Sequence, residues 1–581
     1  MKELFKNLKF VWNYAENQKG KLIILIIIGI VQIIINVIFP ILSARIVVSL
    51  TTNEYFRILL IAIIILILDS VYNCLNYLVR IITIKVHRNV LFELEVNLGE
   101  NILKLENESL DKNGSGVFIQ RLTGDTSNIS GVFNSILEIL TRLITYIGIL
   151  IAMFIVNKLV FLYVICSLII LYVLERVRTF KKNECDKEAR KAKEKASGFI
   201  GELVRGARDI KMLNSEDDFI KELSKKIDDA NYKQMKMKKV SWNYYLIIGQ
   251  FDSIFSFLLI VLLIILMKDN YLIPTTALVL YNYFGRVSGL IYTVGNLLEY
   301  IKDFNLSSER IRAIIDDKEF TKEKFGNKHL TKVNGDFEFK NVSFKYDTKY
   351  VLKDLSFKVK ANETVAFVGK SGAGKTTIFN LLCKMCKVNS GTITIDGVNI
   401  NELDKDSIRG NITIISQNPY IFNMSIRDNL KLVKSDLTNK EMKEACKIAC
   451  LEDFIKELPN GYDTIIGEGG VNLSGGQKQR LAIARALVQK TEIILFDEAT
   501  SALDNQTQEK IQEAIENMKN EYTILIIAHR LSTIINADRI LYLDNGKIEA
   551  EGTHKELLKN CEKYKKLYES EIINKSNKNN I

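Results

Sequence analysis

Long apolar runs in the first 300 residues constrain the fold more than any other feature of the chain. A helix rises 1.5 Å per residue, so a run of about 20 apolar residues can cross a hydrocarbon core of about 30 Å. The segment Ile23–Ile28 has no polar face, which is typical of a helix surrounded by lipid. The sequence therefore predicts a polytopic α-helical membrane domain with six transmembrane helices. The predicted spans are about 22–50, 55–79, 130–156, 159–178, 243–267 and 271–300.

Two other interpretations of the first apolar run are weaker. A soluble helical bundle would need a polar face toward water, which this run lacks. A secretory signal would be shorter and would end in a small-residue cleavage site, and here further apolar runs follow.

The distribution of lysine and arginine predicts the orientation of the spans. Residues 1–21 hold five lysines and the segment 181–240 is dense in basic residues, whereas the connections near 51–54, 157–158 and 268–270 hold few. The positive-inside rule then places both termini on the cytoplasmic side of the cell membrane. The net charge of +11 follows from this bias and from anionic lipids, so we expect no nucleic-acid partner.

A phosphate-binding pattern lies in the more polar second half of the chain. Residues 369–376 fit G-x-x-x-x-G-K-[ST] between the apolar strand-like run Thr364–Val368 and the helix-like run Ile378–Leu382. In such a loop the backbone N–H groups turn inward, Lys375 reaches the β- and γ-phosphates and the Thr376 hydroxyl ligates Mg²⁺. The expected nucleotide contacts are Gly369, Lys370, Ser371, Gly372, Ala373, Gly374, Lys375, Thr376 and Thr377.

A second apolar run, Ile493–Phe496, ends in the carboxylates Asp497 and Glu498. On its own such a pair is more typical of an ordinary acidic loop. Beside a phosphate loop, one carboxylate can hold Mg²⁺ and the other can polarise an attacking water.

These segments, together with the run Leu473–Gln477, resemble the ATP-binding cassette of ABC transporters. The whole chain resembles an exporter-type half-transporter, a six-helix transmembrane domain fused to a C-terminal α/β P-loop NTPase domain. The resemblance implies ATP and Mg²⁺ as cofactors and ATP hydrolysis to ADP and phosphate coupled to transport. The implied divisions are an interfacial elbow segment at 1–20, a transmembrane domain at 21–304, a linker at 305–334, the nucleotide-binding domain at 335–570 and a polar tail at 571–581.

The resemblance also implies a role for single residues. Tyr346 would stack on adenine, a role that any flat aromatic face can fill. The implied catalytic residues are Glu498, His529, Lys375 and Gln417, and the implied magnesium ligands are Thr376, Gln417 and Asp497. The residues implied to complete the site of a partner subunit are Ser474, Gly475, Gly476, Gln477 and Asp504.

One segment departs from the family pattern. The exporters usually have Glu-Arg-Gly before the signature, and in this chain Gly469 follows Glu468 where the arginine would be. This departure puts the contact of that segment with a partner's coupling helix in question. The coupling regions themselves resemble Leu110–Gly116 and Gly201–Ile210, although polar helices on a solvated face would look the same.

Several alternatives remain open at this level. The signature Leu473–Gln477 and the residue Glu498 are both of the type found in active transporters, so two identical chains could form two working sites, which favours a homodimer. A heterodimer with a second half-transporter fits the same sequence. The expected activity is export of a hydrophobic or amphipathic substrate of the multidrug or lipid type by alternating access. The alternatives are a dedicated peptide or bacteriocin exporter and, in another class, an ATP-gated channel or regulatory module.

Charged residues inside the spans are the available clues to the substrate. They are costly in lipid and therefore indicate function unless they are paired. Glu138 and Arg142 lie four residues apart and can pair on one helix face, whereas Asp69 and Asp252 have no partner nearby in sequence. The eight cysteines form no framework, and Cys383 and Cys386 have no second pair, so we expect neither zinc binding nor redox work.

Overall fold

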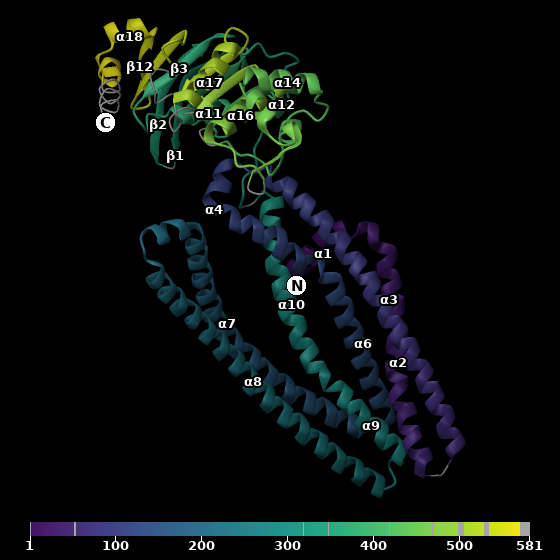
Figure 1. Ribbon diagram of the computed structural model, residues 1–581. Coiled ribbons are helices and arrows are strands. Elements are labelled where there is room, and N and C mark those ends of the chain that lie inside the picture. The colour runs from purple at the N-terminus through teal and green to yellow at the C-terminus, as the bar shows by residue number, and fades with distance from the viewer. Residues whose placement is uncertain are drawn as a thin grey trace. The chain divides into compact units, whose positions relative to one another are not determined.

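The structure is a computed structural model that describes residues 2–51, 54–317, 319–346, 348–416, 419–467, 470–497, 505–527 and 534–569. The chain forms two compact units. The first comprises Met1–Lys104 and Asn113–Phe320, and the second comprises Leu105–Lys112 and Thr321–Ile581. The first unit is helical and the second is built around β-sheets (Figure 1). The predicted fold class is therefore confirmed.

The helical unit consists mainly of long apolar helices. In the described part of the chain, five helical segments are long and apolar enough to cross a membrane, and they contain α2, α3, α6, α7 and α8. The first helix, α1, is short and lies within the expected interfacial segment. The helix bounds are α1 Lys2–Tyr14, α2 Lys19–Thr51, α3 Tyr55–Ile102, α4 Asn107–Gln120, α5 Thr126–Ser130, α6 Val132–Val156, α7 Lys158–Met212, α8 Glu216–Lys268, α9 Pro274–Val287 and α10 Gly289–Ile315.

The sixth expected span, 271–300, is divided into α9 and α10 at Ser288. Serine and glycine together are a common cause of helix interruption, and Ser288 is followed by Gly289. A Cβ atom on Gly289 would lie 2.9 Å from the Tyr146 hydroxyl, so glycine allows this close approach to α6. Beyond the interruption, α10 continues to Ile315, into the segment expected to be a linker.

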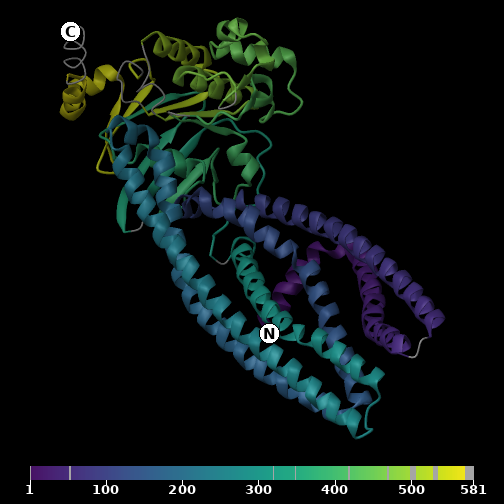
Figure 2. The same cartoon turned by 60° about the horizontal axis from the view of Figure 1, so that its bottom comes forward.

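Helices α7 and α8 form a long antiparallel hairpin that lies side by side in both views (Figures 1 and 2). The Asn157 side chain caps α7 by accepting hydrogen bonds from the backbone N–H groups of Leu159 and Val160, at 3.0 and 3.1 Å. At the other end Asn214 adopts a φ of 52°, which closes the turn into α8. Each of these helices has an apolar half and a polar half, and the turn at Asn214 joins the two polar halves.

The second unit contains a six-stranded sheet in the order β12-β11-β3-β10-β9-β6. Its five strands from β11 to β6 are parallel, and β12 pairs antiparallel with β11. The carboxyl ends of parallel strands meet at one edge of a sheet, where α/β proteins bind ligands. The strand bounds are β3 Thr364–Gly369, β6 Ile412–Ile415, β9 Ile493–Asp497, β10 Thr523–Ile527, β11 Arg539–Asp544 and β12 Lys547–Gly552.

Smaller elements surround this sheet. A four-stranded antiparallel sheet has the order β2-β1-β4-β5, and β7 pairs with β8. Its strands are β1 Phe337–Tyr346, β2 Lys349–Val359, β4 Ser390–Ile395 and β5 Val398–Asn399, with β7 Met424–Ser425 and β8 Ile465–Ile466 apart. The helices are α11 Lys375–Leu382, α12 Lys405–Arg409, α13 Ile426–Lys431, α14 Asn439–Ile448, α15 Glu452–Glu457, α16 Gly475–Gln489, α17 Asn505–Met518 and α18 His554–Asn560.

Two hydrophobic cores cover the two faces of the parallel sheet. Successive side chains of a strand point to opposite faces, so neighbours in one strand enter different cores. In β3, Val365 and Phe367 pack with the antiparallel sheet and α11, whereas Ala366 and Val368 pack with α14 and α16. The sheet is therefore buried on both faces, as expected for parallel strands rich in isoleucine, leucine and valine.

A short segment from the first half of the chain belongs to the second unit. The backbone N–H of Glu106 donates to the Thr321 carbonyl at 2.9 Å, and Leu105 forms a bridge with Lys322. The Thr321 hydroxyl also donates to the Glu106 carboxylate at 2.7 Å. The following segment is held by Glu323, which accepts two hydrogen bonds from Arg409 at 2.8 and 2.6 Å.

Candidate functional site

The phosphate-loop pattern lies between β3 and α11, at the carboxyl edge of the parallel sheet. Gly374 precedes α11 with a φ of 101°, and a Cβ atom there would lie 2.6 Å from a methyl group of Leu352. Glycine is therefore required at this turn by conformation and by space. The loop leads directly into a helix N-terminus, which favours negative charge.

Lys375 is the first residue of α11, and its side chain is buried although it carries a charge. The ammonium group donates to the carbonyl oxygens of Gly369 and Lys370 at 2.8 and 3.0 Å. These contacts hold the ammonium against the same loop whose N–H groups the sequence assigns to phosphate. An ammonium at this position can attract the phosphate oxygens of a nucleotide.

Thr376 of α11 and Asp497 at the end of β9 are brought together by the fold. The Thr376 hydroxyl donates to the Asp497 carboxylate at 3.2 Å, and Asp497 ends β9, two strands away from β3 in the sheet. Hydroxyl and carboxylate oxygens are the ligands that Mg²⁺ prefers. Among the described residues no group of three or more His, Cys, Asp or Glu could hold a metal ion. The pair of one hydroxyl and one carboxylate is compatible with Mg²⁺, which usually binds one or two carboxylates together with substrate phosphates.

Tyr346 ends β1 and lies near α11. Its side chain is 47% exposed, and its ring meets Phe344 edge-on with centroids 4.8 Å apart. Burial raises the pKa of its hydroxyl, and hydrogen bonds with Thr377 and Asn380 of α11 act in the opposite direction. The ring is therefore fixed beside the helix that follows the phosphate loop while part of it stays accessible to a ligand.

The signature residues lie at the start of α16, which packs against α14 and β6. Ser474 caps this helix: its hydroxyl accepts from the N–H of Gln477 at 3.3 Å, and the Gln477 side chain accepts from the N–H of Ser474 at 2.8 Å. Gly475 and Gly476 form the first turn of the helix. This is a second helix N-terminus with a preference for anions.

The remaining predicted residues of the nucleotide site lie outside the described residues. They are Gln417, Glu498, Asp504 and His529, together with Glu468 and Gly469 of the departing segment. In sequence, Glu498 follows Asp497 directly and His529 follows Ile527 by two positions. Asp497 and Ile527 are register partners in the ladder between β9 and β10. The roles assigned to these residues remain predictions.

The charged residues that the sequence singled out in the spans have different surroundings. Glu138 and Arg142 pair at 2.7 Å and line a cavity, whereas Asp69 is exposed and accepts from Asn73 at 3.2 Å. One carboxylate oxygen of Asp252 is buried and has no hydrogen-bond partner in the described chain.

Sequence analysis missed Arg286, which lines the same cavity as Arg142. Its charge inside an apolar run was the signal that could have identified it.

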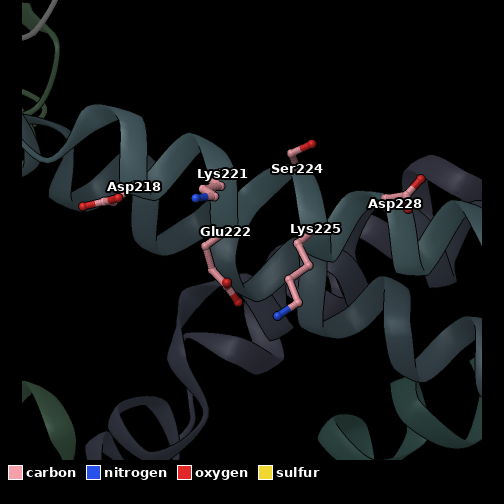
Figure 3. A pocket seen from close by; sticks show the side chains of 6 residues that line it. All are labelled: Asp218, Lys221, Glu222, Ser224, Lys225 and Asp228. Carbon is pink, nitrogen blue, oxygen red and sulfur yellow. The ribbon is translucent and has the colours of Figure 1, made fainter.

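A separate hollow of about 650 Å³ lies on the surface of α8 (Figure 3). Its lining residues all come from the polar part of this helix, and Glu222 pairs with Lys226 at 3.0 Å. Alternating acidic and basic side chains on one helix face are typical of a solvated surface. The residues that line it are Asp218, Lys221, Glu222, Ser224, Lys225 and Asp228.

The chain combines a phosphate loop at the carboxyl edge of a parallel sheet with several helices long enough to span a membrane. These two features define its class as a membrane protein with a P-loop NTPase domain. A family model described as "ABC transporter" matches residues 352–501, and one described as "ABC transporter transmembrane region" matches residues 22–288. The chain belongs to the ABC transporter family, with the exporter-type order of a membrane region followed by the nucleotide-binding region.

Individual relatives match over most of the chain. An uncharacterized ABC transporter ATP-binding protein, YfiC of Bacillus subtilis, is 30% identical over 97% of this chain and 94% of its own length. An ATP-dependent lipid A-core flippase of Photobacterium profundum is 32% identical over 82% of each chain. A solved structure of a bacterial Atm1-family ABC exporter with ATP bound has a TM-score of 0.83 at 24% identity, covering 95% of this chain and 98% of that one. That structure has the same fold.

Proposed function

We propose that this protein is an ATP-driven exporter that moves a hydrophobic or amphipathic substrate across the cell membrane by alternating access. It acts as a dimer, most simply of two identical chains, with the nucleotide-binding domains and both termini in the cytoplasm. Closure of the dimer on ATP favours one orientation of the membrane domain, and hydrolysis with product release restores the other.

Each nucleotide site combines two chains. The phosphate loop, Lys375 and Tyr346 of one subunit hold ATP, and Ser474 to Gln477 with Asp504 of the other subunit close over it. Thr376, Asp497 and Gln417 hold Mg²⁺, which when bound neutralises phosphate charge. Glu498 polarises the attacking water and His529 contacts the γ-phosphate, so that hydrolysis yields ADP and phosphate.

The observation that carries this proposal is the contact between Thr376 and Asp497 at the end of the phosphate loop, in a chain with long apolar helices. It brings two of the three predicted magnesium ligands together beside the buried ammonium of Lys375. The likeness to a protein named as a lipid A-core flippase supports an amphipathic substrate.

The test uses the full-length protein in sealed lipid vesicles with the nucleotide-binding domains outward. We expect Mg²⁺-dependent ATP hydrolysis and ATP-dependent accumulation of an amphipathic substrate inside the vesicles, measured against a panel of fluorescent lipids, drugs and peptides. Accumulation of peptides alone would replace the proposal with a dedicated peptide exporter. Substrate flow that only equalises concentrations would identify an ATP-gated channel instead.

A further inference from the structure

A cavity of about 720 Å³ lies within the helical unit, between α2, α3, α6 and α9. Ligand-binding cavities of proteins commonly have this size. Its lining extends along α2 from Leu25 to Asn36, a distance of about 16 Å at 1.5 Å per residue. Although these helices are apolar overall, the cavity is lined by many of their polar residues.

The charged residues of the lining are Arg80, Arg142, Arg286 and Glu138, which give it a net charge of +2. Glu138 pairs with Arg142 at 2.7 Å, so its negative charge is balanced by that arginine. Within the described residues no carboxylate forms an ion pair with Arg80 or Arg286. Arginine stays protonated in proteins, so both positive charges persist within a helical unit whose spans are largely apolar.

Arg286 lies at the depth of the middle of α2. Its guanidinium donates to the Asn36 carbonyl at 3.1 Å and to the Asn36 side-chain oxygen at 3.4 Å, and it lies 5.8 Å from the ring centroid of Phe39. Asn36 is about 25 Å along α2 from Lys19, near the centre of this helix. These neutral contacts orient the guanidinium but leave its charge uncompensated. A charge at this depth is costly unless it has a partner of opposite sign.

Neutral polar groups line the same cavity as these arginines. The Gln32 amide donates to Asn76 at 2.9 Å, which joins α2 to α3 inside the cavity. The hydroxyl groups of Thr141 and Thr145 donate to carbonyl oxygens of their own helix at 2.8 Å each. Amide and hydroxyl groups of this kind can exchange hydrogen bonds with an ester or hydroxyl group of a ligand.

We propose that this cavity binds the anionic head of an amphiphile, with a phosphate or carboxylate group facing Arg286 and the apolar tail among the helices. This inference rests on the proposed export function and specifies its substrate class. Planar guanidinium groups suit phosphate and carboxylate oxygens because they can donate two parallel hydrogen bonds. The same net charge of +2 disfavours cationic amphiphiles, which include many drugs.

The test measures direct binding to the purified full-length protein in zwitterionic lipid nanodiscs. The probe is a fluorescent short-chain phosphatidic acid, and its displacement is followed by fluorescence anisotropy. We expect dioctanoyl phosphatidic acid to compete strongly, and dioctanoyl phosphatidylcholine and a cationic alkylammonium to compete weakly. Glycerol phosphate, which has the charge without the tail, separates a free anion from an amphiphile and should also compete weakly.

Four variants relate this selectivity to the cavity. Arg286→Gln should weaken binding of the anionic probe by at least about tenfold, because it removes the unpaired charge, and Arg286→Lys should restore part of it. Glu138→Gln should tighten binding of the same probe, because it removes the one carboxylate among the described residues of the lining. Arg45→Gln is the matched control, since Arg45 is an exposed arginine of α2 that does not line the cavity.

The outcomes separate this inference from the proposed function. Equal affinity for anionic and zwitterionic competitors, or unchanged anionic binding in Arg286→Gln together with Glu138→Gln, would overturn the anionic cavity. Competition by glycerol phosphate as strong as that of phosphatidic acid would overturn the amphiphile and leave a small-anion site. ATP hydrolysis by the wild-type protein is measured in the same samples, so loss of charge selectivity with normal hydrolysis counts against the cavity alone. Selective binding without any hydrolysis counts against the exporter alone.

Discussion

Thr376 and Asp497 are separated by 121 positions in the chain, yet the hydroxyl of the first donates to the carboxylate of the second at 3.2 Å. The contact exists because the phosphate loop follows β3 and Asp497 ends β9, and both strands end at the same edge of the sheet. It links the two chemical parts of the proposed site, the loop that holds phosphate and the carboxylate that holds a metal.

Asp497→Asn tests this link. The amide keeps the shape of the side chain and can still accept a hydrogen bond from Thr376, but it lacks the negative charge that favours Mg²⁺. We expect the Mg²⁺ concentration for half-maximal ATP hydrolysis to rise about 10- to 100-fold, as measured by titration at saturating ATP. Asp453→Asn, at an exposed carboxylate of α15, is a control that should leave this concentration unchanged. An unaltered Mg²⁺ requirement in Asp497→Asn would remove it from the metal site.

Glu498→Gln should leave ATP binding intact and nearly abolish turnover. The carboxylate is proposed to polarise water and not to hold nucleotide, so the amide keeps the shape and loses the chemistry. Steady-state hydrolysis and retention of radiolabelled ATP after gel filtration check the two halves of this prediction. Near-normal hydrolysis would exclude Glu498 as the catalytic carboxylate.

Tyr346→Ala should weaken ATP affinity by about tenfold, whereas Tyr346→Trp should preserve it, because stacking on adenine needs a flat aromatic face. The measurement is displacement of a fluorescent ATP analogue from each variant. The nearby Tyr350→Ala serves as a control, since Tyr350 is a comparably exposed tyrosine on β2. Equal weakening by the alanine and tryptophan variants would show that the hydroxyl, which contacts Thr377 and Asn380, is what matters.

A mixed dimer tests whether each site is shared between two chains. Lys375→Ala and Ser474→Arg homodimers should both be inactive, because each has two damaged sites. In a mixed dimer of the two variants, both lesions meet in one site and the other site keeps an intact Lys375 and an intact Ser474. We therefore expect partial ATP hydrolysis from the mixed species, isolated through two different tags.

The measurement on the mixed dimer includes nucleotide trapping at a single site as well as turnover, since the two sites could need to act together. If each chain built a complete site by itself, every site of the mixed dimer would be damaged. The absence of both trapping and turnover would then contradict the shared site.

The local parts of the fold were predictable from sequence. Apolar runs specify the long helices, and the spacing of Gly374 and Lys375 after a buried strand specifies the phosphate loop, because both depend on neighbouring residues. The ending of Ile493–Phe496 in a carboxylate pointed to the edge of the sheet for the same reason. The roles of Glu498 and His529 came from the resemblance to the family and remain to be tested.

Long-range contacts could not be predicted in this way. Arg286 meets Asn36 across 250 positions, and nothing near either residue specifies the other. The interruption of the sixth span at Ser288 also depends on tertiary packing, because Gly289 lies against Tyr146 of another helix. A hydropathy pattern contains no information about contacts between helices, and it therefore predicts one continuous helix.

The pairing of Glu106 with Thr321 has a practical consequence for anyone who isolates the soluble half of this protein. A recombinant fragment beginning at Thr321 omits residues 105–112, so the Thr321 carbonyl loses the Glu106 N–H that donates to it, and Lys322 loses its bridge partner Leu105. Water would replace those groups, and the first residues of the fragment would fray. Supplying residues 105–112 as a fused N-terminal extension should restore this hydrogen bond, which slows hydrogen exchange of the Glu106 amide. The nucleotide-binding half of the molecule is therefore not formed by one uninterrupted stretch of the sequence.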